Sequence, residues 1–179
     1  MYVGNLEEYQ GIDLLLESFV LVLRKAERAE LVIIGGQRRH IQKYEQKSRQ
    51  LGVERKVRFL GPKPVQGLAE WLAGADLLVS PRIKGSNTPM KIYSYLHSGK
   101  AIVATNLATH TQILDSRVAM LTEPSREEFA KAILYLMEND TLRTRLGEAG
   151  KKLVDDKYSY AVFREKLYSL FDWLESEVA

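Results

Sequence analysis

The sequence predicts an α/β protein with a doubly wound, Rossmann-like parallel sheet of about six strands, helices on both faces and extra C-terminal helices. Short apolar runs such as Glu30–Gly35, Asp76–Ser80 and Ala101–Thr105 have the length and composition of strands buried on both faces. Segments with helical periodicity separate these runs, as in a chain of βα units. The 179 residues are 45% hydrophobic and 27% charged, so residues 1–179 are expected to form one domain with an ordinary core.

The strands and helices follow one another in a regular order. The strands are expected at residues 1–4, 30–35, 56–60, 76–80, 101–105 and 118–121. Helices are expected where apolar residues recur at helical spacing, as at Leu15, Phe19 and Val22, and they end where Gly52 and Gly99 stand. The expected helices span 11–26, 41–51, 65–73, 88–98, 108–114, 125–138, 140–155 and 160–176.

The last three helices have no strand between them, so they are expected either to pack on the sheet or to reach towards another domain. Four aromatic side chains in predicted helices are expected to be packing residues: Trp71, Tyr93, Tyr95 and Trp173.

Composition excludes several classes of function. The chain has no cysteine and only three histidines, none at metal-ligand spacing, so neither a bound metal nor a cofactor is expected. A net charge of +3 is mild, and no nucleic-acid partner is expected. No apolar run approaches the roughly 20 residues that span a bilayer, and residues 1–5 lack the pattern of a signal peptide. A cytoplasmic location is therefore expected.

The loop Gly85-Ser86-Asn87-Thr88-Pro89 follows the strand at 76–80 and precedes the helix at 88–98. Thr88 and Pro89 suit the first turn of that helix, whose free amides would attract an anion. Read locally, the loop could equally be a capped helix start with surface lysines nearby. Its place at the carboxyl end of a central strand favours phosphate binding.

The loop after the first strand, residues 4–11, has a glycine at each end but does not match GxGxxG. The second strand ends in Gly35-Gly36 without an acidic residue for a ribose hydroxyl. A nicotinamide-dependent oxidoreductase is therefore disfavoured. The chain also offers no nucleophile elbow and no acidic cluster after its first strand.

Four stretches in order resemble the carboxyl-terminal domain of GT-B glycosyltransferases, most closely the retaining enzymes called glycosyl transferases group 1, or family four. They are YVGNLEEYQGIDLLLESF, LVIIGG, VRFLG and ADLLVSPRIKGSNTPMKIYSYLHSGKAIVAT. The resemblance covers nearly the whole chain. It implies a domain that binds a nucleotide-diphospho-sugar, an amino-terminal acceptor-binding domain that is absent here, and a retaining transfer without metal. A full-length enzyme of this kind could also associate peripherally with a membrane.

The resemblance also implies where the donor would bind. Asn5 and Gln10 stand where the family has an arginine and a lysine that face the diphosphate, and Ser86 and Ser94 stand near its paired glutamates. The resemblance also matches Leu60 and Gly61 to the edge that meets the nucleobase. The expected donor-binding residues are Gly4, Asn5, Gln10, Gly36, Leu60, Gly61, Arg82, Lys84, Gly85, Ser86, Asn87, Thr88, Pro89, Met90, Lys91 and Ser94. No catalytic residue is assigned, and His110 is expected to be a satisfied structural histidine.

Two further readings stay open. The four polar departures favour a degenerate relative that binds a nucleotide sugar or a protein without catalysis. A sugar-nucleotide epimerase of the same architecture would need acid/base carboxylates, which this chain does not offer. Neither reading changes the expectation that the chain folds alone and turns over poorly alone.

Overall fold

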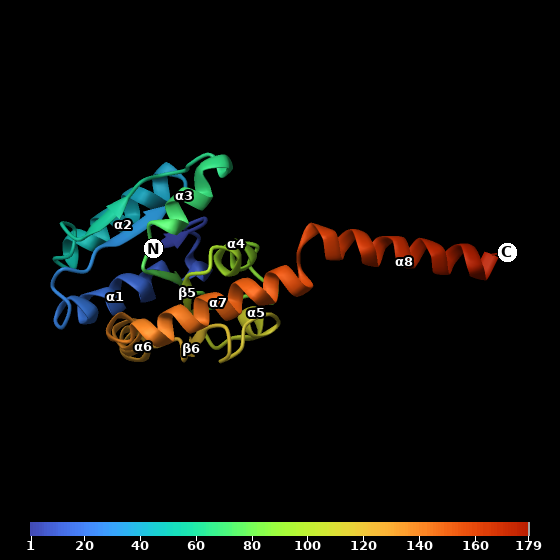
Figure 1. Cartoon of the computed structure of the whole chain (residues 1–179). Coiled ribbons are helices and arrows are strands. Elements are labelled where there is room, and N and C mark those ends of the chain that lie inside the picture. Colours follow the sequence, from blue (N-terminus) through green and yellow to red (C-terminus); the bar gives the residue numbers. More distant parts are fainter. Residues whose placement is uncertain (179) are drawn as a thin grey trace.

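The computed structural model describes residues 1–178, and its elements alternate as the sequence predicts (Figure 1). The strands are β1 (Tyr2–Val3), β2 (Leu31–Ile34), β3 (Val57–Phe59), β4 (Leu77–Ser80), β5 (Ala101–Thr105) and β6 (Met120–Thr122). The helices are α1 (Ile12–Leu23), α2 (Arg38–Gln50), α3 (Leu68–Ala73), α4 (Lys91–His97), α5 (Ala108–Thr111), α6 (Arg126–Glu138), α7 (Asp140–Lys157) and α8 (Tyr160–Val178), with 3-10 turns η1 (Glu8–Gln10) and η2 (Val65–Gly67).

All strand pairs are parallel and form two three-stranded sheets, β1-β2-β3 and β4-β5-β6. The sheets meet where β1 lies beside β4. The amine of Met1 donates to the Leu77 carbonyl at 2.6 Å, and the amide of Val79 donates to the Met1 carbonyl at 3.0 Å. The strand order is therefore 3-2-1-4-5-6, with the switch in direction between β1 and β4. In such sheets, ligands bind at the carboxyl ends of the strands beside the switch.

Both faces of the sheet are covered, as the continuous apolar strands predict. Along β5, Ala101 and Val103 belong to one core cluster, whereas Ile102 and Ala104 belong to the other. This alternation follows from the two-residue period of a strand. The first cluster is completed mainly by α1 and α6, and the second by α4 together with Val154 of α7.

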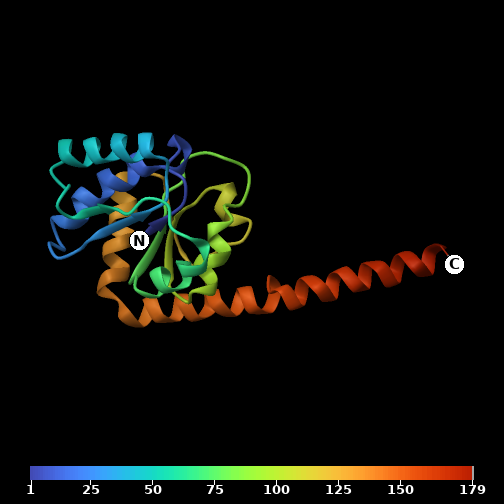
Figure 2. The ribbon, with the colours of Figure 1, turned by 90° about the horizontal axis from the view of Figure 1, so that it is seen from above.

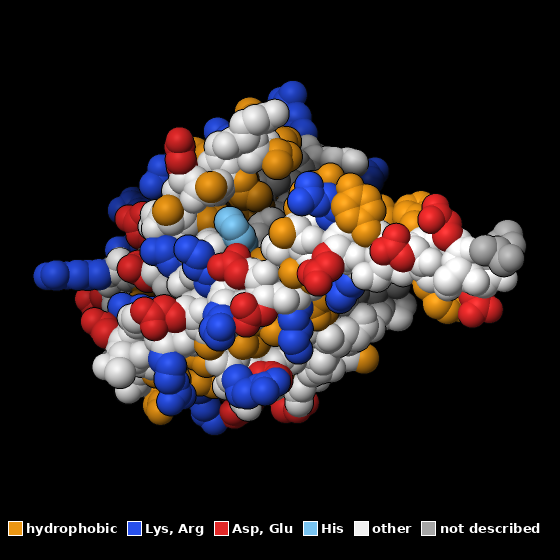
Figure 3. Space-filling view, turned by 45° about the vertical axis from the view of Figure 1, so that its right-hand side comes forward, with side chains coloured by type: hydrophobic (Ala, Val, Ile, Leu, Met, Phe, Trp, Pro, Cys, Tyr) orange, Lys and Arg blue, Asp and Glu red, His pale blue; other side chains and the backbone are white. Residues whose placement is uncertain are grey.

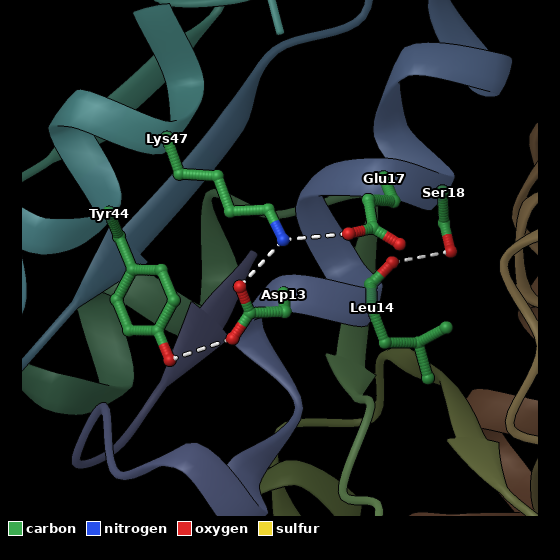
Figure 4. A network of polar contacts seen from close by, with 6 residues as sticks. All are labelled: Asp13, Leu14, Glu17, Ser18, Tyr44 and Lys47. Carbon is green, nitrogen blue, oxygen red and sulfur yellow. Dashed lines mark hydrogen bonds and ion pairs between the residues drawn. The ribbon is translucent and has the colours of Figure 1, made fainter. Parts of the chain in front are cut away.

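A polar network joins α1 to α2 at the surface (Figure 4). The Lys47 ammonium contacts carboxylate oxygens of Asp13 and Glu17 at 2.6 Å each, and the Tyr44 hydroxyl donates to Asp13 at 3.2 Å. Because these charges are partly exposed, the pairs stabilise the fold only modestly. Their main effect is to fix α2 alongside α1.

The last three helices differ in whether they pack on the domain. Helices α6 and α7 pack on the domain, whereas α8 points away from it (Figures 1 and 2). Figure 3 shows hydrophobic side chains beside acidic ones on this helix, and Phe163, Phe171 and Trp173 are each more than half exposed. The prediction that Trp173 packs is therefore wrong, while Tyr95 is buried as predicted. No helix within residues 1–178 combines the length and apolarity needed to cross a membrane.

Candidate functional site

A pocket of about 250 Å³ opens at the carboxyl ends of β1 and β4, the place that the sheet topology favours. Its lining comes from the β1 loop and from the segment that leads into α4. The lining residues are Gly4, Asn5, Tyr9, Gln10, Arg82, Asn87, Thr88, Pro89, Met90 and Lys91. Nine of these ten residues belong to the predicted donor-binding set, and the structure brings them together.

The two loops touch because one position of the β1 loop has no side chain. Gly11 has φ 73°, and a Cβ placed there would lie 1.9 Å from the Pro81 carbonyl oxygen. The amide of Ile83 also donates to the Tyr9 carbonyl at 3.0 Å. Only glycine allows both this conformation and this approach, so Gly11 sets the width of the pocket.

Arg82 lies beneath the 84–88 loop and is only 9% exposed. Its Nε donates to the Lys84 carbonyl at 2.9 Å, and its Nη1 donates to the Asn87 carbonyl at 2.7 Å and to Thr109 Oγ1 at 2.9 Å. The guanidinium also lies over the Tyr9 ring, 4.9 Å from its centroid. Arg82 therefore holds the loop from inside.

Lys91 enters the same pocket from the start of α4. Its Nζ donates to Gln10 Oε1 at 3.0 Å and lies 3.9 Å from the centroid of the Tyr2 ring. Burial, with a smaller contribution from Arg82, holds the pKa of the Lys91 amine well below its ordinary value. Within residues 1–178, no ion pair includes Lys91 or Arg82, so both cations lack a carboxylate partner.

Helix α5 fixes the outer side of the GSNTP loop. Thr109 Oγ1 donates to the Asn87 carbonyl at 2.6 Å, and Gln112 Nε2 donates to the Ser86 carbonyl at 2.9 Å. Thr88 Oγ1 donates to Gln112 Oε1 at 2.7 Å. Within residues 1–178, the amides of residues 84–88 donate no hydrogen bond to another protein group. The carbonyls of Lys84, Ser86 and Asn87 are held, whereas the loop amides keep their hydrogen-bonding capacity.

The prediction that Thr88 caps α4 is wrong. The helix begins at Lys91, Met90 is its N-cap residue, and no side chain caps it. The hydroxyl of Thr88 is engaged by Gln112 instead, and the Pro89 carbonyl accepts a turn hydrogen bond from Ile92. A tertiary contact thus replaces the local cap that the sequence suggests.

His110 is fully buried behind the pocket. Its Nδ1 lies 2.8 Å from the Thr105 carbonyl oxygen, so Nδ1–H donates there, and its Nε2 lies 2.8 Å from Ser80 Oγ, so Nε2 accepts. The pKa of His110 is lowered to about 4, mainly by burial; the hydrogen bond to the Thr105 carbonyl opposes this shift, and the nearby charges of Lys91 and Arg82 add to it. The ring is neutral and satisfied at neutral pH, in agreement with the prediction of a structural histidine.

The other predicted residues lie around the pocket rather than in its lining. Lys84, Gly85 and Ser86 are exposed on the loop, and Ser94 lies three residues after Lys91 on α4 but outside the pocket lining. Gly36 and Gly61 lie at the carboxyl ends of the neighbouring strands β2 and β3 with Leu60. The Gly35 amide donates to the Gly61 carbonyl at 2.8 Å, which lines up the ends of β2 and β3. Their part in binding a nucleobase stays a prediction.

Sequence reasoning missed two aromatic residues of the site. Tyr2 supplies the ring beneath Lys91, and Tyr9 supplies the ring beneath Arg82. The signal for Tyr9 was its position in a loop bracketed by glycines. Tyr2 gave no signal, because a tyrosine in a strand ordinarily packs in the core.

A larger hollow of about 740 Å³ lies at the opposite edge of the sheet, near the amino ends of β2 and β4. It is lined largely by apolar side chains, including Phe19, Val22 and Met137. Because no loop from the carboxyl ends of the strands reaches it, its size does not make it the better candidate.

The model of the family described as glycosyl transferases group 1 matches residues 1–139, which is more than half of the chain. The chain belongs to this family. The resemblance drawn from its motifs is therefore confirmed.

Curated relatives of the family support the same assignment. The chain is 26% identical over 178 residues to the D-inositol 3-phosphate glycosyltransferase of Corynebacterium aurimucosum, covering 95% of this chain and 42% of that protein. It is 25% identical over 176 residues to the phosphatidyl-myo-inositol mannosyltransferase of Mycobacterium leprae, covering 96% of this chain and 46% of that protein. The chain thus spans less than half the length of these relatives.

Solved structures share the fold of the chain. HepE from Anabaena in complex with UDP superposes with a TM-score of 0.83 at 17% identity, over 96% of this chain and 48% of HepE. The C-terminal domain of the group 1 protein LpcC from Francisella tularensis gives 0.77 at 23% identity, over 89% of this chain and 85% of that domain. The predicted Rossmann-like fold is confirmed.

Proposed function

We propose that this chain is the donor-binding part of a glycosyltransferase that takes a sugar from a nucleotide-diphospho-sugar, with retention of configuration and without a bound metal. The observation that carries the proposal is a pocket at the switch of a parallel sheet that contains two cations, Arg82 and Lys91, without a carboxylate partner. Unpaired, partly desolvated cations are costly unless an anion joins them. Membership of the group 1 family points to a nucleotide sugar as that anion.

The chemistry that such a pocket can perform is electrostatic. When the sugar leaves, negative charge develops on the diphosphate, and a fixed ammonium together with free backbone amides would stabilise it. Arg82 holds the carbonyls of Lys84 and Asn87, and within residues 1–178 the amides of the 84–88 loop donate to no protein group. This arrangement supplies charge stabilisation from the protein itself, which is why we propose a transfer without metal.

We further propose that the acceptor site lies in the portion of the longer protein that corresponds to the rest of its relatives. The chain covers 42% and 46% of the two relatives described above. The exposed apolar side chains of α8, among them Phe163, Leu170 and Phe171, would pack against that portion.

A second candidate is a family member that binds the donor without transferring its sugar. Two neutral side chains, Asn5 and Gln10, stand in the β1 loop, and Ser94 lies outside the pocket lining. The two candidates differ in the longer protein, which should release nucleoside diphosphate in the presence of donor and acceptor under the first and not under the second.

The proposal is tested by calorimetric titration of this chain with UDP, GDP and ADP at low salt, with EDTA present. We expect saturable binding of one nucleotide. The exposed Lys131→Met variant, changed on α6 far from the β1 loop, should bind that nucleotide with unchanged affinity and so controls for general loss of positive charge. Failure of all three nucleotides to bind to folded protein would contradict donor binding by this chain.

A further inference from the structure

The position of the Lys91 ammonium is unusual for its place in the sequence. Lys91 begins α4, yet its Nζ reaches across to the β1 loop and lies 3.0 Å from Gln10 Oε1. Gln10 is 7% exposed, and its Oε1 lies 3.3 Å from the Tyr2 hydroxyl oxygen, whose single proton is donated to the Asn5 carbonyl at 2.6 Å. One N–H of the ammonium is used by Gln10, and two remain for a ligand. The side-chain amide of Gln10 therefore positions the Lys91 ammonium through this hydrogen bond.

Arg82 does not have the same freedom. Three of its five donors are used on the Lys84 carbonyl, the Asn87 carbonyl and Thr109. Its remaining nitrogen, Nη2, lies directly beneath Gly85, where an added Cβ would come within 2.6 Å of it. The guanidinium thus lies in the pocket lining with most of its donors turned to the loop that covers it.

We propose that Lys91, held by Gln10, is the side-chain cation that contacts phosphate in this pocket, and that Arg82 positions the 84–88 loop instead of contacting the ligand. The inference rests on the proposed function for the identity of the anion as the diphosphate of a nucleotide. Gln10 and Lys91 therefore act as a pair, and an ammonium supplied from position 10 could replace the one supplied from position 91.

The groups around Lys91 determine how phosphate binding would change the protonation of its amine. The titratable or charged groups that face it are the Tyr2 hydroxyl, the guanidinium of Arg82 and the ring of His110. Burial raises the pKa of Tyr2, so its hydroxyl stays neutral, and His110 is neutral as described above. Within residues 1–178 no carboxylate pairs with the ammonium, so an arriving phosphate would raise the pKa of the amine and increase its protonation.

The test is a charge-exchange experiment with inorganic pyrophosphate and UDP as probes, measured by calorimetry at pH 7.5. Lys91→Met should weaken binding of both probes roughly ten- to a hundredfold, the effect of losing a hydrogen bond to a charged group. Methionine replaces an ammonium that has no carboxylate partner, so the variant should fold, which near-UV circular dichroism would check. The double variant Gln10→Lys with Lys91→Met returns an ammonium to the same place and should recover most of the lost affinity.

A purely structural role for Lys91 predicts a different result, because the double variant would then bind no better than Lys91→Met. Proton uptake gives a second readout. Titration of wild type in two buffers of different ionisation enthalpy should show protons taken up on pyrophosphate binding, and Lys91→Met should lose this uptake.

The outcomes separate this inference from the proposed function. If UDP binds to wild type and Lys91→Met binds it equally well, the Lys91 inference fails while donor binding stands. If pyrophosphate binds through Lys91 but no nucleotide binds, the inference stands and the proposed function fails. If neither probe binds to folded wild type, the Lys91 inference is wrong.

Discussion

His110 should make this protein lose stability in mild acid. Its pKa is about 4 in the folded protein against 6.5 for an ordinary histidine, chiefly because burial disfavours the charged ring. Protonation would also place a second proton on Nε2, which now accepts from Ser80. Between these two values the unfolded chain binds more protons than the folded protein. The contribution of His110 to stability is complete above pH 6.5, falls as pH decreases and is fully lost below about pH 4.

The size of the effect follows from the same two values. One pKa unit corresponds to about 1.4 kcal/mol, so the linkage integrated from pH 7.5 to pH 5 gives a loss of about 2 kcal/mol. Urea unfolding followed by circular dichroism at both pH values measures this difference. The His110→Gln variant should be less stable at pH 7.5 but should lose about 2 kcal/mol less on acidification than wild type.

The exposed His97 on α4 gives a matched control, and His97→Gln should keep the wild-type response to pH. The reasoning would be refuted if His110→Gln and wild type lost the same free energy between pH 7.5 and pH 5. Such a result would mean that the buried ring is protonated in the folded protein or that Ser80 turns its hydroxyl to accommodate the second proton without cost.

Three other predictions concern the loops, the last helix and the pocket. Gly11→Ala should lower the stability of the protein far more than Gly52→Ala. Both positions have positive φ, worth about 1–2 kcal/mol of strain, but only at Gly11 would the added Cβ meet a backbone atom, the Pro81 carbonyl. Equal melting temperatures of the two variants would contradict this. A chain shortened to end at Ser159 should have a free energy of unfolding within about 1 kcal/mol of that of the full chain, since neither core cluster of the described residues includes a side chain of α8. A large drop in the urea midpoint would show that α8 supports the domain. The affinity for pyrophosphate should fall as pH rises through the lowered pKa of Lys91, because the neutral amine must then take up a proton before it can bind the anion. If the Lys91→Met variant showed the same pH profile, Lys91 would not be the group that causes it.

Sequence patterns predicted the parallel α/β fold because its signals are local. Strands buried on both faces must be continuously apolar, and residues 101–105 satisfy this without regard to the rest of the chain. Helix ends were less well predicted where a tertiary contact overrides a local preference. Thr88 has the chemistry of a cap, but Gln112, 24 residues away in sequence, takes its hydroxyl and α4 begins later.

The location of the candidate site was also predictable, because the order of parallel strands fixes which loops meet at the switch. The roles of its residues were not. Arg82 and Lys91 are both plausible phosphate ligands in the sequence, and only the structure shows that Arg82 is occupied by backbone carbonyls whereas Lys91 crosses to Gln10.

By itself, then, the sequence determined the order of elements, the two-faced sheet and the edge at which the candidate site lies, since each depends on periodicity and strand order. The tertiary structure alone decided which cation is free, how the GSNTP loop is held and that α8 projects from the domain. These properties depend on contacts between residues far apart in the chain, such as Lys91 with Gln10. A side chain has a fixed number of hydrogen-bond donors and acceptors, and only the folded structure shows which of them its neighbours already occupy.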